Sequence, residues 1–296
     1  MRYDRLRGYG LVLIAAALWA TLGLFYKRLD GYGLSSLTIV FYRAAVAAMA
    51  LLLALGRLRP SWLRLERRDW LLFAIFGLTG VAAFYAVYIY AISLTGMGMA
   101  AVLMYTAPAW VTLFGALFLG ERLSWLKSSA IMLTCAGCVL ISRAYDLSSV
   151  RLNLLGILAG LGAGLTYGLY TLFSKVAQHR YTAWATLAYA LGMGALFLLP
   201  LQSPADLARA LTTPSSVFWL LALGLVPTLG GGLAFNAALR LVPASNASIV
   251  ATLEPAIATL LGWAFLGEQL ETLQLLGGGL ILTAVVILQR EAAPLP

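Results

Sequence analysis

Apolar residues run along this chain in long blocks and do not alternate regularly with polar ones. Each block is about 20 residues long, which as a helix crosses the ~30 Å hydrocarbon layer of a membrane. A transmembrane β-barrel would require alternation of apolar and polar positions, so the pattern predicts an all-α integral membrane protein with ten transmembrane helices. The predicted spans are 8–26, 34–56, 70–93, 97–119, 125–142, 154–174, 182–201, 215–239, 245–266 and 272–289.

Composition supports the same class of protein. Hydrophobic residues make up 62% of the 296 positions and charged residues only 10%, against about 25% charged in soluble domains. The arginines and the apolar run at the N-terminus resemble a signal peptide, but the run continues to Tyr26. We therefore expect an uncleaved first span, with the lipid bilayer as the main surroundings of the protein.

The net charge of +9 is distributed unevenly along the chain. If the N-terminus lies in the cytoplasm, 14 of the 20 Lys and Arg residues fall on the cytoplasmic side, 5 fall on the other side, and Arg43 lies within a span. This bias predicts a multi-pass protein of the inner (cytoplasmic) membrane with both termini in the cytoplasm. The basic excess is thereby explained by topology and acidic lipid headgroups, and no nucleic-acid partner is expected.

Two segments of the chain repeat each other. Residues 108–126 and 255–273 match without a gap at a shift of 147, and 11 of their 19 positions are identical. The shift is half of the chain, so we predict two five-helix repeats, residues 1–147 and 148–296. Because five is odd, the second repeat enters the membrane from the opposite side, which makes the repeats inverted. Inverted repeats are typical of secondary transporters, which hold the substrate between the halves.

The repeat also carries a family resemblance. The chain is similar to the EamA family of the drug/metabolite transporter superfamily, and most similar there to bacterial aromatic amino-acid exporters. The resemblance implies two inverted bundles and export of small metabolites. It rests on Trp19, Lys27, Arg43, Tyr105-Thr-Ala-Pro108, Leu119-Gly120-Glu121, Lys175, Glu254-Pro255 and Leu266-Gly267-Glu268.

Three spans contain a proline: Pro108, Pro227 and Pro255. Each proline lacks an N–H and frees a carbonyl four residues earlier, at Met104, Leu223 and Ala251. Free carbonyls are tolerated in a membrane only where protein or a water-filled cavity covers them. Since Pro108 and Pro255 are repeat partners, we expect helix breaks that face each other across a cavity or hinge. Harmless kinks are the alternative.

Two ionisable residues are predicted near the middle of the membrane. Arg43 and Glu254 each lie about nine residues, or roughly 13 Å, from the end of their span. Charges at that depth are costly and need a partner or water. In one interpretation Arg43 binds a substrate carboxylate, or Glu254 takes an amine or a proton. In the other, each is bonded to carbonyls of a broken helix or to the other.

Aromatic and polar side chains complete the candidate cavity. Buried tyrosines need a partner for the hydroxyl, which favours a wet cavity in the membrane. Lys27 and Lys175 lie at corresponding positions of the repeats and are gating candidates, although either could instead extend to an interface. Asn236 and Asn246 either contact the substrate or bond across helices. The aromatic candidates are Trp19, Tyr85, Tyr88, Tyr105, Tyr167 and Tyr170.

Other kinds of function find less support. No nucleotide-binding G-x-x-x-x-G-K-[ST] motif occurs, so ATP is not expected as an energy source. Cys135 and Cys138 lie in an apolar span without partners for zinc, and the single histidine, His179, excludes a histidine relay; we expect no cofactor, no metal and no catalytic residues. A transporter of a small molecule, most simply an amino acid, is the prediction. A nucleoside, a sugar or another amino-acid derivative remains an alternative substrate. An intramembrane enzyme or a channel remains an alternative class of protein. The sequence does not indicate an oligomeric state.

Overall fold

The computed structural model describes residues 2–146 and 153–291, which are helical or in short connections and contain no β-strand. In this part of the chain, eight helical segments are long and apolar enough to cross a membrane, and two shorter apolar helices complete a set of ten. The prediction of an all-α membrane protein with ten apolar spans is confirmed. The segments are Tyr3–Asp30, Ser36–Leu58, Arg67–Thr95, Met97–Leu119, Leu154–Ala177, Ala183–Leu201, Pro214–Ala238, Ala244–Leu266 and the shorter Trp125–Ile141 and Thr272–Leu288.

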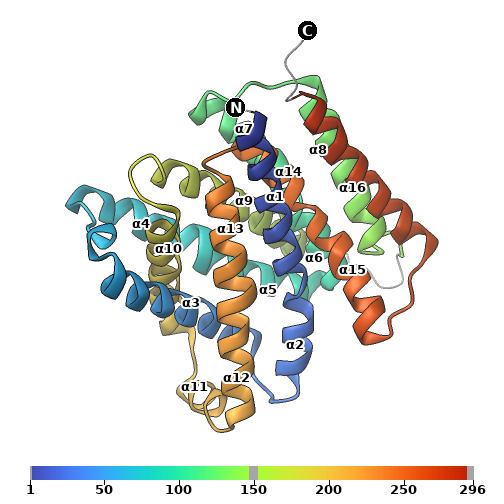
Figure 1. Ribbon diagram of the computed structural model, residues 1–296. Coiled ribbons are helices and arrows are strands. Elements are labelled where there is room, and N and C mark those ends of the chain that lie inside the picture. Colours follow the sequence, from blue (N-terminus) through green and yellow to red (C-terminus); the bar gives the residue numbers. More distant parts are fainter. Residues whose placement is uncertain (1, 147–152, 292–296) are drawn as a thin grey trace.

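Several spans are built from more than one helical piece, as Figure 1 shows. The first half contains α1 (Arg2–Ala20), α2 (Leu22–Asp30), α3 (Ser36–Leu58), η1 (Pro60–Leu63), η2 (Arg67–Asp69), α4 (Trp70–Phe76), η3 (Gly77–Ala83), α5 (Phe84–Thr95), α6 (Met97–Met104), α7 (Ala107–Leu119) and α8 (Trp125–Ile141). The second half contains α9 (Leu154–Ala177), α10 (Ala183–Leu198), η4 (Leu199–Leu201), α11 (Pro204–Ala210), α12 (Pro214–Leu223), η5 (Gly224–Gly230), α13 (Gly231–Ala238), α14 (Ala244–Ala251), α15 (Leu253–Leu266) and α16 (Thr272–Glu291).

The two halves are interleaved. Helix α9 of the second half packs against α5, α6 and α7, while α1 of the first half packs against α13, α14 and α15. Glycines on one face of α9 allow the close approach: a β-carbon at Gly160 would lie 2.6 Å from the side chain of Leu103, and one at Gly164 would lie 2.4 Å from the hydroxyl of Thr106. The corresponding helices of each half therefore contact the other half and enclose the space between the halves.

Interruptions occur at equivalent places in the two halves. Tyr105 and Thr106 separate α6 from α7, and Thr252 separates α14 from α15. Each threonine hydroxyl donates a hydrogen bond of 2.6 Å to the carbonyl three residues earlier, of Leu103 and Ile249. A hydroxyl that satisfies a backbone carbonyl lowers the cost of a helix end inside a membrane. These interruptions lie two to three residues before Pro108 and Pro255.

Two π-helical turns also occupy equivalent positions. They are η3 and η5, which begin at Gly77 and Gly224, 147 residues apart. Pro227 lies inside η5 and is one reason for the irregular backbone there. No proline occurs in η3, so the sequence did not indicate this turn. A β-carbon at Gly77 would come 2.3 Å from Met193, which shows how closely α10 crosses η3.

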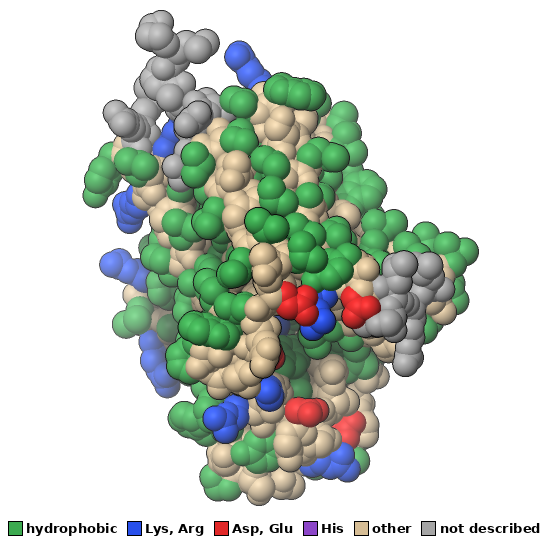
Figure 2. Space-filling view, turned by 90° about the vertical axis from the view of Figure 1, so that its right-hand side faces the viewer, with side chains coloured by type: hydrophobic (Ala, Val, Ile, Leu, Met, Phe, Trp, Pro, Cys, Tyr) green, Lys and Arg blue, Asp and Glu red, His purple; other side chains and the backbone are tan. Residues whose placement is uncertain are grey.

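The outer surface is apolar where it would meet lipid. Figure 2 shows that apolar side chains cover much of the face turned to the viewer, with charged side chains gathered in separate places. Phe118 and Phe265, which are repeat partners, each expose 70% of their surface. A soluble protein would not leave large aromatic side chains exposed in this way, and a bilayer provides the apolar solvent they need.

Candidate functional site

The side chain of Arg43 connects two spans from different halves. It projects from α3, is 8% exposed, and donates from Nε to the hydroxyl of Thr228 in η5 at 3.1 Å. Thr228 in turn donates to the carbonyl of Leu223 at 2.9 Å, and this is the carbonyl that Pro227 leaves without a helical partner. The arginine is therefore bonded, through one hydroxyl, to a broken helix. The side chain of Tyr26 on α2 is a further hydrogen-bond partner of Arg43.

The guanidinium of Arg43 also lies over an aromatic ring. Its central carbon is 5.0 Å from the ring centroid of Tyr85 on α5. A cation over a ring is stabilised by about 2 kcal/mol when both are shielded from water. Arg43 also interacts electrostatically with Tyr26 and Glu254. These contacts orient the arginine towards the space between α3, α5 and α15.

Glu254 is the acidic counterpart in this space, and it is only partly buried. It lies in the first turn of α15, directly after the interruption at Thr252, where the positive end of the helix dipole stabilises a carboxylate. Among the described residues it has no hydrogen bond and no ion pair, and Arg43 is not within ion-pair distance of it. It interacts electrostatically with Tyr88, Tyr105 and Tyr167.

Aromatic side chains from four helices meet beside the two charges. Trp19 lies edge-on to Tyr167 with ring centroids 6.5 Å apart, and Tyr167 stacks on Phe84 at 5.4 Å. Phe84 also stacks on Tyr88 at 6.0 Å. The structure thus brings together the candidates Trp19, Tyr88 and Tyr167. Phe235, which packs 5.2 Å from Trp19, was not among the sequence candidates because a buried phenylalanine resembles any other core residue.

Other sequence candidates bond across helices. Asn236 donates to the hydroxyl of Tyr170 at 3.1 Å and accepts from Gln178 at 3.0 Å. Asn246 donates to the hydroxyl of Tyr9 at 2.8 Å. Of the two roles left open for these asparagines, the structure shows the bond between helices. Gln178 and Tyr9 had no signal in the sequence, because their partners are more than 50 residues away.

A carboxylate and a lysine hold the turn between α13 and α14. Glu121 accepts hydrogen bonds from the N–H groups of Ala244 at 2.6 Å and Ser245 at 3.2 Å, and from the Ser245 hydroxyl. Lys175 donates to the carbonyls of Leu239 and, at 2.9 Å, of Val242. Lys175 was a gating candidate, whereas Glu121 was noted only as part of the repeat. The recurrence of Glu121 as Glu268 in the repeat was the sequence feature that could have identified it as a functional residue.

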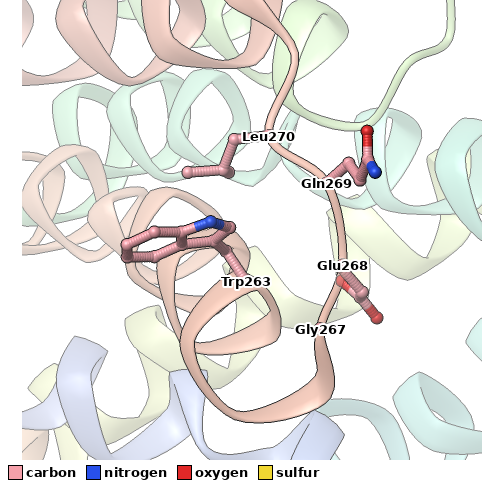
Figure 3. A pocket seen from close by; sticks show the side chains of 5 residues that line it. All are labelled: Trp263, Gly267, Glu268, Gln269 and Leu270. Atoms are coloured by element: carbon pink, nitrogen blue, oxygen red, sulfur yellow. The ribbon is translucent and has the colours of Figure 1, made fainter.

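Lys27 and Glu268 occupy the matching positions of the other half but are arranged differently. Both are exposed, and the side chain of neither has a hydrogen bond or ion pair with a described residue. Glu268 lines a surface pocket of about 410 Å³ after α15, together with Trp263 and Leu270. Figure 3 shows that Trp263 and Leu270 face each other across this pocket, while the Glu268 and Gln269 side chains point to the other side of the loop.

A second cavity, of about 290 Å³, opens between α8, α15 and α16. Its lining is mainly apolar and includes Ile257, Leu260 and Leu282. Neither this cavity nor the Glu268 pocket is lined by Arg43 or Glu254. The site formed by Arg43, Glu254 and the aromatic side chains is therefore separate from both cavities, and we define it by the residues that meet there.

Comparisons with known proteins identify relatives of the whole chain. The profile of the EamA-like transporter family matches residues 6–143 and again residues 154–290. An uncharacterized transporter of Archaeoglobus fulgidus is 32% identical over 98% of both chains. A probable terminal-alkyne amino-acid exporter of Streptantibioticus cattleyicolor is 30% identical over 89% of this chain and 86% of the relative. A solved structure has a TM-score of 0.77 at 19% identity, covers 97% of this chain and 99% of that chain, and shows the same fold.

Proposed function

The chain belongs to the EamA-like transporter family, and we propose that it is a secondary transporter that exports amino acids, aromatic ones included. In this proposal residues 1–147 and 148–296 form two inverted repeats, which open the central site to either side of the membrane in turn. The protein lies in the inner membrane with both termini in the cytoplasm, on the basis of the distribution of Lys and Arg.

The observation that carries the amino-acid assignment is the separation of Arg43 and Glu254. The two opposite charges approach the same space from different halves without an ion pair between them. A free amino acid has a carboxylate and an ammonium group on one carbon atom. The guanidinium of Arg43 is the complement of the carboxylate, and the Glu254 carboxylate is the complement of the ammonium.

The energetics favour a substrate role for Glu254 in particular. A charge at the centre of a bilayer costs about 2.5–3.5 kcal/mol even when a helix carries it into the membrane. Arg43 offsets part of this cost through Thr228 and Tyr85. Glu254 is stabilised by the N-terminus of α15 and at longer range by Arg43, but it has no ion pair or hydrogen bond with a described residue, so a bound ammonium group would complete the compensation of its charge.

The side-chain part of the substrate would contact the aromatic cluster. Trp19, Tyr85, Tyr88, Tyr105 and Tyr167 come from α1, α5, the α6–α7 turn and α9. They surround Arg43 and Glu254 through ring contacts and electrostatic interactions. Ring faces suit apolar and aromatic side chains of amino acids. Tyr170, Asn236, Asn246 and Lys175 instead support the helices around the site.

The S. cattleyicolor relative is named as an exporter of an amino acid, which agrees in substrate class. Uptake of radiolabelled phenylalanine into proteoliposomes preloaded with unlabelled phenylalanine tests the proposal. Saturable counterflow is expected, and it also separates a carrier from a channel. Two analogues test the paired charges: phenethylamine lacks the carboxylate and 3-phenylpropionate lacks the ammonium, so both should compete poorly. Equal competition by either analogue, or no phenylalanine transport beside transport of a nucleoside or sugar, would refute the assignment.

A further inference from the structure

The two Leu-Gly-Glu segments of the repeat have the same local structure. Gly120 and Gly267 end α7 and α15 in the left-handed conformation, with φ of 67° and 70°. The N–H groups of Glu121 and Glu268 donate to the carbonyls of Gly115 and Gly262, at 3.0 and 3.3 Å. A glycine is required at both C-caps because other residues adopt this conformation at a cost.

The carboxylates are also held in the same way. A β-carbon at Gly115 would lie 3.2 Å from the Glu121 carboxylate oxygen, and one at Gly262 would lie 2.3 Å from that of Glu268. Each glutamate therefore rests against a glycine of its own helix. The close glycine backbone therefore orients each carboxylate whether or not the carboxylate has a hydrogen-bond partner.

The side chains of Glu121 and Glu268 differ in their hydrogen-bond partners. Glu121 accepts the first N–H groups of α14, and Lys175 binds the carbonyls that precede this helix. We call these contacts the Glu121–Lys175 clamp. The equivalent side chains, of Glu268 and Lys27, are exposed and have no hydrogen bond or ion pair in the described part of the chain. The target of an equivalent clamp would be the start of α6, since Met97 corresponds to Ala244 at the shift of 147.

The start of α6 is exposed at Met97, whereas Gly98 packs closely against the carbonyl of Ser142 at the end of α8. Met97 is 72% exposed, and no side chain of a described residue accepts a hydrogen bond from the N–H groups of Met97 or Gly98. Helix α14 packs against α7, whereas α6 and α15, the corresponding pair, make at most marginal contact. The first N–H groups of a helix require an acceptor, and a carboxylate is a stronger acceptor there than water.

Backbone irregularity near Lys27 provides a means of movement. The first span is broken at Thr21, between α1 and α2, and Lys27 lies on α2. The corresponding span, α9, is unbroken from Leu154 to Ala177 and brings Lys175 to its carbonyls. Helix α2 packs against α12 and α15 here, so Lys27 would have to move with α2 to reach the turn between α5 and α6.

We propose that Glu268 and Lys27 form a second clamp, on the turn between α5 and α6, in the alternative conformation in which the Glu121–Lys175 clamp is released. This proposal rests on the proposed alternating access and adds the residues that hold each end closed. The exchange replaces one set of charge-assisted hydrogen bonds by a similar set. Glu121 has in addition an ion pair with Lys127 at 3.6 Å, and the counterpart of Lys127 is the uncharged Gln274, so the Glu121–Lys175 clamp is the stronger of the two. Glu268 and Lys27 are positioning residues and do not contact the substrate.

Hydrogen exchange at the two helix starts tests the clamps without any substrate. In proteoliposomes Glu121→Gln should raise exchange at Ala244 and Ser245 and at the same time lower exchange at Met97 and Gly98. A shift of about tenfold is expected, the size of the loss of a strong helix cap. Adding Glu268→Gln to that variant should restore fast exchange at Met97 and Gly98. Unchanged exchange at Met97 and Gly98 in Glu121→Gln, or after the second substitution, would overturn the proposal.

A transport measurement adds a variant whose folding is not at risk. Glu268 is exposed and unpartnered, so Glu268→Gln should fold normally, yet it should slow phenylalanine counterflow about tenfold without changing the substrate concentration for half-saturation. Glu271→Gln is the matched control, because Glu271 lies in the same loop but pairs with Arg143 at 2.7 Å. Equal rates in Glu268→Gln and in the control would contradict the clamp. If hydrogen exchange changes in opposite directions at the two helix starts but the protein does not transport phenylalanine, the clamp is supported and only the amino-acid assignment is rejected.

Discussion

Nε of Arg43 donates a hydrogen bond of 3.1 Å to the hydroxyl of Thr228, and the same hydroxyl donates to the carbonyl of Leu223. One threonine thus satisfies two groups that would otherwise be unpaired in the membrane. The side chain of Thr228 thereby stabilises both the guanidinium of Arg43 on α3 and the irregular backbone of η5. This arrangement gives Arg43 a structural function that is distinct from the substrate contact proposed for it.

Thr228→Val should destabilise the fold, because it removes the hydroxyl and leaves the Leu223 carbonyl and Arg43 Nε without partners. The expected cost is about 1–2 kcal/mol, the upper range for hydrogen bonds between membrane helices. Thermal unfolding in detergent measures the effect. Thr228→Ser retains the hydroxyl and should unfold near the wild-type temperature; equal temperatures for the two variants would show that the hydroxyl is not needed.

Arg43→Gln and Glu254→Gln should have different consequences. Loss of the arginine removes a charged hydrogen bond of about 1.5–3 kcal/mol and should lower the melting temperature and the folded yield. Loss of the Glu254 charge removes an unpartnered carboxylate, so the protein should fold normally while phenylalanine counterflow falls at least tenfold. Glu271→Gln controls for the loss of a negative charge elsewhere.

The behaviour of Glu254→Gln also distinguishes an ammonium site from a proton site. If Glu254 binds the substrate ammonium, both exchange and accumulation driven by a pH gradient should fall together. A folded variant that exchanges phenylalanine at the wild-type rate but no longer accumulates it in a pH gradient would instead identify a proton site. Full activity in both assays would remove Glu254 from the mechanism.

Single aromatic substitutions in the cluster should have moderate effects. Ring contacts contribute about 0.5–1.5 kcal/mol each, so Tyr167→Ala should weaken phenylalanine transport roughly tenfold at most. Tyr167→Phe keeps the ring and should retain most of the transport. Tyr90→Ala is a suitable control, because Tyr90 is 51% exposed. Identical losses for the three variants would indicate a general effect on folding.

Cysteines at Arg122 and Gln269 should be labelled from opposite faces of the membrane. Both residues are exposed neighbours of the repeated glutamates, so labelling reports topology without disturbing the Glu121 contacts. An impermeant maleimide applied to cells should react at position 269 and not at position 122, in a background without Cys135 and Cys138. Reaction of both positions from the same face would exclude inverted repeats.

Much of the fold was predictable because it depends on local properties of the chain. The spans follow from runs of apolar residues, and the breaks near Pro108 and Pro255 follow from the missing N–H groups. The π-helical turn η3 was not predicted, since α10 approaches closely at Gly77 and no local residue indicates the turn.

The sequence indicated candidate residues for the site and did not indicate their contacts. The depth of Arg43 and Glu254 follows from counting along a span, but Thr228 is 185 residues from Arg43, and no local pattern connects them. The different states of Glu121 and Glu268 could not be predicted, because the two segments are nearly the same in sequence. In the proposed transport cycle, their difference arises from how the two halves are arranged in one conformation.

Helices α8 and α16 have a further consequence for movement. They pack along each other, and a β-carbon at Gly137 would lie 2.7 Å from the carbonyl oxygen of Gly277. The two helices are counterparts in the repeat, so exchanging the shapes of the halves converts this contact into itself. A contact of this kind does not have to open during a transport cycle. Under the proposed alternating access, we therefore expect this pair to be a stationary frame and the other eight spans to move beside it.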